Sequence, residues 1–216
     1  MPPESIKFFK KMKKVLLAGA IALFGLSNAQ IAKGTTYLSG QVGYSSTQDN
    51  NTDSKVEDFT IVPTVGYFVA NNVAVGLGVG YANGSTTTTS MLTNIETKLS
   101  TDAFVVAPFV RKYWTVGEKL YIFGQLEVPM AFGKDKAEYS GAASQFNTES
   151  KFTSIGVNVK PGLDYFLNKN WSIEATIGEF GYNNFKYKDL DKSTDNFNFG
   201  LNLSSVTFGV KYVFAK

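Results

Sequence analysis

The chain has 216 residues, with Lys+Arg 21 against Asp+Glu 18, and it contains neither Cys nor His. The near balance of charge argues against a nucleic-acid partner. The lack of Cys excludes disulfides and thiolate chemistry, and the lack of His removes the commonest general base and transition-metal ligand. High counts of Gly (20), Tyr (11) and Phe (18) are typical of β-barrels.

The beginning of the chain predicts a secretory signal peptide over residues 1–29. The basic segment Met12–Lys14 precedes an apolar run, Val15–Leu26, and the small residues Ser27–Ala29 precede Gln30. A transmembrane helix is disfavoured because the apolar run is shorter than about 20 residues. Residues 1–11 form an upstream extension, so the true start is Met1 or Met12. We expect the folded domain over residues 30–216.

The rest of the chain alternates apolar and small or polar residues with a period of two, which indicates β-strands. The segment Val73–Ala82 shows the alternation most clearly. The same test predicts eight antiparallel strands, near residues 35–45, 57–69, 73–83, 98–114, 119–132, 151–167, 171–182 and 197–214.

The predicted connectors alternate in length along the chain. Three are short (70–72, 115–118 and 168–170), and four are long and polar (46–56, 83–97, 133–150 and 183–196). An even number of strands with short turns at one end and long loops at the other is typical of an outer-membrane barrel. We therefore predict an all-β, up-and-down transmembrane barrel whose short turns face the periplasm.

Prolines and one change of phase complicate this pattern. Pro63, Pro108 and Pro161 occupy equivalent positions in three similar segments, which indicates hairpin duplication and predicts a kink or bulge at each proline. In the last strand, the alternation through Phe197 and Phe199 is out of phase with that through Phe208 and Val210. This change predicts a β-bulge near residues 204–205.

The two faces of the strands differ in a way that points to lipid. One face is apolar, whereas the other carries glycine, amide and charged side chains, which the dry core of a soluble barrel would not tolerate. The apolar face is therefore predicted to face lipid. Aromatic residues at the short-turn ends predict a periplasmic girdle: Tyr67, Trp114, Tyr165, Trp171, Tyr212 and Phe214.

Six charged residues are predicted to face the lumen. Arg111, Asp164, Glu174 and Lys211 lie at equivalent distances from the short-turn end and should form one layer, with Glu127 and Lys160 paired above them. An eight-stranded barrel is just wide enough for side chains to fill, and buried charges are normally paired. The prediction is a plugged lumen, with a narrow gate that opens by exchange of ion pairs as the alternative.

The carboxyl end, Thr207–Phe214, resembles the β-signal read by the outer-membrane assembly machinery, although Ala215 and Lys216 follow the terminal Phe. Together with Pro108–Tyr113 and Gly66–Val69, it resembles the outer-membrane β-barrel domain family common in Bacteroidota, akin to small OmpA- and OmpX-like barrels. The resemblance covers residues 30–216. It implies location in the bacterial outer membrane, contact with its lipid, and an assembly signal that includes Gly209, Tyr212 and Phe214.

The residues point to no catalytic, cofactor or metal site, because the loop Ser and Asp residues have no His partner and no calcium-loop spacing. The leading hypothesis is a structural or surface-interaction barrel whose long loops contact an extracellular ligand. A small pore or gated channel is the second, and a secreted lipocalin-type barrel the third. An enzyme is the least favoured.

Overall fold

The structure is a computed structural model, and it describes residues 31–90, 93, 95–200 and 206–214. The predicted signal peptide, Gln30 and the predicted bulge at 204–205 lie outside these residues. Among the described residues, no helix is long and apolar enough to cross a membrane. Most of the described chain, 78%, is β-strand, and the described residues include one short 3-10 helix, η1 (Gly141–Phe146).

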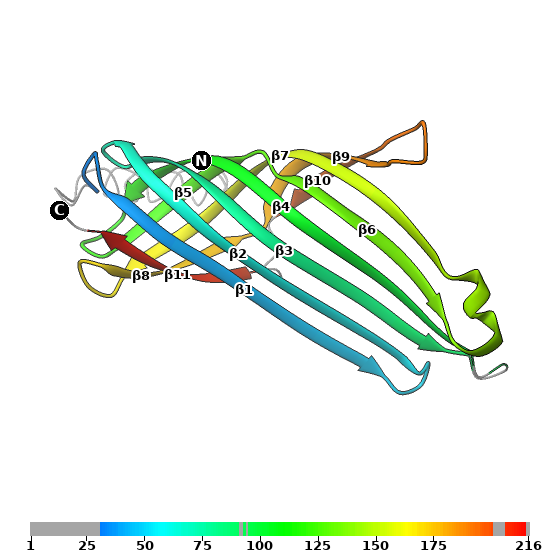
Figure 1. The fold of residues 1–216 in the computed structure, drawn as a ribbon. Coiled ribbons are helices and arrows are strands. Elements are labelled where there is room, and N and C mark those ends of the chain that lie inside the picture. The colour runs from blue at the N-terminus through cyan, green and yellow to red at the C-terminus, as the bar shows by residue number, and fades with distance from the viewer. Residues whose placement is uncertain (1–30, 91–92, 94, 201–205, 215–216) are drawn as a thin grey trace, which may run out of the picture.

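The strands form a single closed antiparallel barrel with eight walls. Five walls are single strands and three are divided into two segments (Figure 1). The single strands are β1 (Thr36–Asp49), β2 (Ser54–Ala70), β3 (Val73–Thr89), β4 (Glu96–Thr115) and β7 (Thr148–Phe166). The divided walls are β5 (Leu120–Glu127) with β6 (Met130–Tyr139), β8 (Trp171–Ile177) with β9 (Glu179–Tyr187), and β10 (Thr194–Gly200) with β11 (Val206–Phe214).

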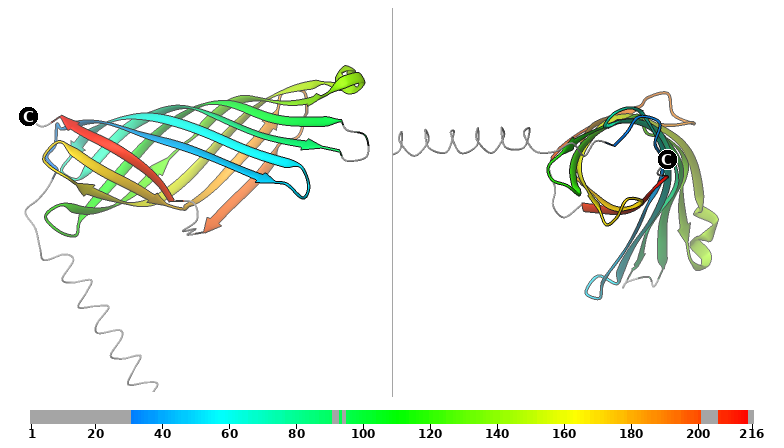
Figure 2. Two further views of the ribbon diagram at one scale, coloured as in Figure 1. Left: turned by 90° about the horizontal axis from the view of Figure 1, so that it is seen from below. Right: turned by 90° about the vertical axis from the view of Figure 1, so that its left-hand side faces the viewer.

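The ring closes between the first and the last strand. Thr36–Gln41 of β1 pairs with Gly209–Phe214 of β11, and β11 pairs in turn with β8. Seen along the axis, this end of the molecule is a complete ring, and the far ends of β1–β4 extend well past it (Figure 2). The predicted eight-stranded antiparallel barrel is confirmed.

The strands are longer than the sequence pattern predicted. Most of the predicted long loops 46–56, 83–97, 133–150 and 183–196 are strand, and the strands leave only residues 50–53, 90–95, 140–147 and 188–193 between them. The prediction was wrong there because it relied on apolar alternation, which ends at the edge of the lipid. The hydrogen bonds between the strands continue beyond that edge. Threonine-rich stretches such as Thr86–Thr89 continue the ladder, since β-branched residues suit a strand even when both faces are polar.

The predicted irregularities also fall elsewhere. The register runs through Pro63, Pro108 and Pro161 without a shift, so no bulge lies at these prolines. Between β8 and β9, in contrast, the pairing with β7 changes from Gly162↔Thr176 to Val159↔Phe180, a shift of one residue. Gly178 stands at this point with φ +70°, a conformation that favours glycine and marks a bulge.

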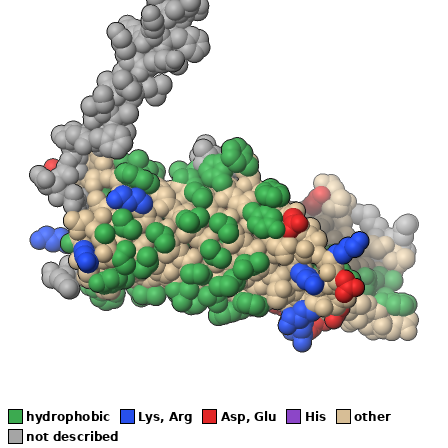
Figure 3. Space-filling model, turned by 90° about the horizontal axis from the view of Figure 1, so that it is seen from above, with side chains coloured by type: hydrophobic (Ala, Val, Ile, Leu, Met, Phe, Trp, Pro, Cys, Tyr) green, Lys and Arg blue, Asp and Glu red, His purple; other side chains and the backbone are tan. Residues whose placement is uncertain are grey.

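The outer surface carries an apolar band around the middle of the molecule, with charged side chains at both ends of it (Figure 3). Along β4 the band runs from Trp114 to Phe104, and along β7 from Tyr165 to Ile155; all four side chains are exposed. Each stretch spans about ten residues, which is the length that a tilted strand needs to cross the hydrocarbon core.

Candidate functional site

The six predicted lumen charges all lie on the inner face of the barrel, on five different walls. Arg111 is on β4, Glu127 on β5, and Lys160 and Asp164 on β7; Glu174 is on β8 and Lys211 on β11. Five of them are almost completely buried, and Lys160 is partly exposed. Period-two alternation alone places them inward, since their neighbours in sequence are the lipid-facing residues.

Arg111 is the centre of the lower charged layer. Its Nη1 lies 2.5 Å from Glu174 Oε2 across the lumen, and its Nε donates to Gln125 Oε1 at 2.7 Å. Nη1 also donates to the hydroxyl of Tyr113 at 3.1 Å. Arg111 is 2 % exposed and Glu174 1 %. Because both charges are out of water, each depends on the other for compensation.

Lys211 and Asp164 form the second pair of this layer. They are in direct contact and fully buried. The ammonium also lies 3.4 Å from the Tyr113 hydroxyl and sits over the rings of Tyr37 and Phe166, at 5.3 and 5.1 Å from their centroids. The layer therefore contains two cation–carboxylate pairs joined through one tyrosine.

A second group of charges lies above this layer. Lys160 Nζ is 2.6 Å from Glu127 Oε1 and 3.4 Å from Glu179 Oε2. Gln125 Nε2 donates to Glu127 Oε2 at 2.6 Å, which links the upper group to Arg111. The sequence did not predict Glu179, because the bulge at Gly178 changes which residues face inward. Its only sequence signal was the isolated glycine in a strand.

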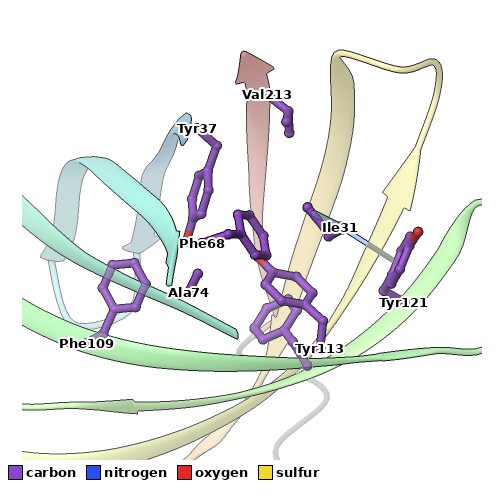
Figure 4. Close-up of a cluster of buried hydrophobic side chains, with 9 residues drawn as sticks. Ile31, Tyr37, Phe68, Ala74, Phe109, Tyr113, Tyr121 and Val213 are labelled. Atoms are coloured by element: carbon purple, nitrogen blue, oxygen red, sulfur yellow. The ribbon is translucent and has the colours of Figure 1, made fainter. Parts of the chain in front are cut away.

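Below the charges the lumen is filled by a cluster of buried aromatic and aliphatic side chains (Figure 4). Phe68 packs between Tyr37 and Tyr113, with ring centroids 5.7 and 5.5 Å away, and Tyr113 packs against Phe123 at 5.7 Å. The Arg111 guanidinium lies 4.1 Å from the Phe123 centroid, close enough for a cation–π contact. The two tiers, charged above and aromatic below, are contiguous.

The start of the described chain packs at the barrel mouth beneath this cluster. Ile31 is buried, and its backbone N–H donates to Asn72 Oδ1 at 2.8 Å while its carbonyl accepts from Asn72 N–H at 3.0 Å. Gly34 N–H donates to the carbonyl of Phe68 at 2.8 Å. A hollow of about 650 Å³ remains at the rim, between this segment and the turns at 118–121 and 166–169.

The aromatic residues that sequence reasoning emphasised were those at the rim. Five of the six predicted girdle residues (Tyr67, Trp114, Tyr165, Trp171 and Phe214) are exposed on the outer face. Tyr212 is partly exposed and packs on Trp171 at 4.9 Å. The predicted assembly-signal residues Gly209, Tyr212 and Phe214 lie on β11, next to β1. The inward aromatics were missed, although Tyr113 follows from its position beside Trp114.

The outer half of the barrel is not filled in this way. A hollow of about 500 Å³ lies between β2, β3, β4, β6, β7 and β9, lined by carboxylates, hydroxyls, one lysine (Lys136) and three aliphatic side chains. Asp135 accepts hydrogen bonds there from Thr101 Oγ1 at 2.7 Å and from the Tyr187 hydroxyl at 2.5 Å. The bond to this carboxylate raises the pKa of Tyr187. No group of residues suited to hold a metal ion occurs in the described part of the chain.

Comparison with known proteins agrees with this architecture. The model of the family "Outer membrane protein beta-barrel domain" matches residues 16–214. The chain belongs to this family. Its place is therefore the bacterial outer membrane, where the apolar band contacts lipid and the polar interior is enclosed. A search among curated proteins finds no match.

Solved structures of small outer-membrane barrels resemble this family member in fold. OprG from Pseudomonas aeruginosa matches with TM-score 0.51 and 14% identity, over 86% of this chain and 98% of OprG. The N-terminal barrel domain of Pseudomonas aeruginosa OprF matches with TM-score 0.45 and 10% identity, over 85% and 100%. Ail from Yersinia pestis, solved with the heparin analogue sucrose octasulfate, matches with TM-score 0.41 and 19% identity, over 84% and 99%.

Proposed function

We propose that this outer-membrane barrel is closed to solutes and serves as a structural or surface-interaction protein through its outer half. The observation that carries the proposal is the two-tier filling of the periplasmic half. Paired charges from four walls lie on a cluster of packed aromatic rings, and Ile31 of the N-terminal segment packs into the same cluster. A solute would have to displace both tiers, leaving charges buried without partners.

The outer half supports the second part of the proposal. Strand extensions carry the polar hollow beyond the apolar band, so its hydroxyls and carboxylates are presented to the outside. Such a surface suits a polar extracellular ligand better than a lipid-soluble one, because orientation in a site depends on a few convergent polar groups.

A gated pore is the second candidate, and one contact favours it. Lys160 lies between two carboxylates, Glu127 and Glu179, and is itself 28% exposed. An ammonium with two partners can move from one to the other without becoming unpaired. If the lower layer opened at the same time, ions could pass.

Conductance in planar bilayers separates the two. For the wild-type protein we expect no sustained conductance, and Lys160→Ala should behave the same, because the Arg111 layer and the aromatic cluster remain. Lys151→Ala, on the outer face, is the matched control. Large sustained conductance of the wild type would overturn the closed barrel. A rise in Lys160→Ala alone would favour the gate.

The surface role is tested separately in cells. A strain lacking the gene should regain envelope integrity with the wild type and with Lys160→Ala. We expect no rescue by a double variant of the hollow, Asp58→Ala with Asp135→Ala, if the outer half is the working surface. Equal rescue by that variant, present at wild-type levels in the outer membrane, would refute this role.

Export and assembly complete the proposal. Residues 1–29 would direct the chain across the inner membrane, and Gly209, Tyr212 and Phe214 of β11 would be read during insertion. Replacing Phe214 with Ala should reduce the amount of folded protein in outer-membrane fractions, whereas Phe146→Ala in the exposed helix η1 should not. Equal amounts of both variants would argue against this assembly signal.

A further inference from the structure

The outer edge of the apolar band has a sharp position on one side of the barrel. Phe104 of β4 faces Phe132 of β6, and both are about half exposed. The next outward-facing pair along the same strands is Asp102↔Lys134. Lipid contact therefore ends and charge begins within one step of the ladder, which locates the headgroup level on this wall.

Lysines are concentrated beside this edge of the apolar band on three adjacent walls. Lys134 of β6 lies directly opposite Lys151 of β7, and Lys186 of β9 lies opposite Thr153, two residues along β7. We call Lys134, Lys151 and Lys186 the lysine patch. Like charges directly opposite each other on a sheet destabilise it, so this arrangement opposes folding unless something else neutralises it.

The protein itself neutralises the patch only in part. Lys134 is 3.3 Å from Glu149, an exposed pair that contributes little. Asp102 and Asp195, the other nearby carboxylates, accept hydrogen bonds from neutral groups: Asp102 from the Tyr81 hydroxyl at 2.5 Å and Asn83 at 2.9 Å, and Asp195 from the Tyr182 hydroxyl and Asn184, both at 2.7 Å. Lys151 and Lys186 are exposed and form no ion pair within the described residues.

The walls on the other side of β4 lack this feature along the same hydrogen-bonded row. Following the ladder from Asp102 across β3 and β2 to β1 leads to Asn83, Phe59 and Tyr44, none of them charged. Lys55 lies further out on β2 and pairs with Glu57 at 2.8 Å. Along this row, lysine is therefore found on the β6 and β7 side of β4 and not on the β1–β3 side.

We propose that the lysine patch binds the phosphate groups of a lipid headgroup in the outer leaflet. Three lysines lie next to the end of the apolar band, and their long aliphatic stems can lie on it while the charges reach the headgroups. Phosphate is the anion that lipid headgroups present to these lysines, and lysine binds phosphate as a point charge. This goes beyond the closed-barrel proposal and does not depend on it.

The test measures binding of purified lipopolysaccharide to the detergent-solubilised barrel by native mass spectrometry. The triple variant Lys134→Gln/Lys151→Gln/Lys186→Gln should bind at least about tenfold more weakly. Each lysine near an anionic surface strengthens binding by a modest factor, and the three factors multiply. The matched control is Lys112→Gln/Lys119→Gln/Lys169→Gln, which removes the same charge at the periplasmic end. A heat-modifiable gel shift verifies that both variants fold.

Three further arms identify the ligand group. Dephosphorylated lipopolysaccharide should bind the wild type as weakly as the intact lipid binds the triple variant. Raising the salt concentration should weaken wild-type binding, because exposed charges are screened. Inorganic phosphate at the same concentration should not compete, since it lacks the acyl chains held by the apolar band. Undiminished binding by the triple variant, equal loss in the control, or indifference to dephosphorylation would each overturn the proposal.

Discussion

The periplasmic and outer halves of this barrel are made from the same strands, yet their interiors are opposite in character. The periplasmic half is a closed ring filled by aromatic rings and paired charges, whereas the outer half is a set of strand extensions around a polar hollow. The difference indicates that the periplasmic half contributes most of the packing that stabilises the fold. The side chains of the periplasmic half pack in one arrangement, whereas the outer half carries polar groups without burying them.

The largest effect is expected from breaking the lower charged layer. Arg111→Ala would leave the Glu174 carboxylate buried without its cation, and loss of one partner of a buried pair typically costs about 3–5 kcal/mol. Urea unfolding in micelles, followed by tryptophan fluorescence and gel shift, measures this. Replacing both partners, Arg111→Met with Glu174→Leu, should restore most of the loss. If the single and double variants were equally destabilised, the pairing would not explain the cost.

A smaller loss is expected from overfilling the same half. A Cβ on Gly76 would lie 2.3 Å from Phe109 Cζ and 2.4 Å from the Val65 carbonyl oxygen, so Gly76→Ala must displace ring or backbone. Overpacking of this kind typically costs about 1–3 kcal/mol. Gly43→Ala on β1 is the control, because a Cβ there meets nothing within 4 Å. Equal unfolding midpoints for the two variants would show that the filling is looser than the geometry indicates.

The two halves also differ in how far the sequence predicted them. Within the band, the alternation at Val73–Ala82 specifies face and strand, because lipid on one side and lumen on the other demand opposite side chains. Beyond the band both faces meet water, so Thr86–Thr89 shows no contrast and its strand was interpreted as loop. Hydropathy cannot detect a ladder that hydrogen bonds alone extend.

The interior shows the same division between local and long-range information. The inward position of Arg111 and Glu174 follows from alternation along each strand. Their contact does not, because β4 and β8 meet only across the lumen, where barrel closure decides the distance. Glu179 was missed for a different reason. The one-residue bulge at Gly178 reverses which residues of this wall face the lumen, and a single glycine in the sequence does not predict a positive φ.

A local effect is expected from a change in the outer half. Asp135→Asn removes the charged acceptor of the Thr101 and Tyr187 hydrogen bonds, at a cost of about 1–2 kcal/mol. Hydrogen exchange should quicken in the outer parts of β6 and β9 and stay unchanged near Arg111, because sub-global opening follows local contacts. Asp189→Asn, in the exposed turn after β9, is the control. Faster exchange throughout the barrel would show that the two halves unfold as one unit.

The smallest effect is expected at the turn between β1 and β2. Hydrogen bonds from the Asn51 backbone N–H, at 2.8 Å, and the Thr52 hydroxyl, at 3.0 Å, hold the pKa of Asp49 below its ordinary value of 3.8. A carboxyl with a lowered folded-state pKa stabilises the turn above the unfolded pKa, and this contribution disappears as pH falls through the folded value. The turn should therefore loosen only in acid. Protonation of Asp49 should not affect the buried charged layer around Arg111, because that layer lies in the other half of the barrel.

The Asn51 amide resonance in micelles, followed from about pH 6 to pH 2 across the ordinary range of carboxyl titration, reads this transition. Its midpoint should lie below 3.8, and Asp49→Asn should abolish the titration. Asp53→Asn, in the same turn, keeps the Asp49 contacts and should leave the midpoint in place. A midpoint at or above 3.8 would mean that these hydrogen bonds do not persist in solution. The outer turns would then be organised by the strand ladder alone, and the contrast between a specified periplasmic half and a permissive outer half would be stronger.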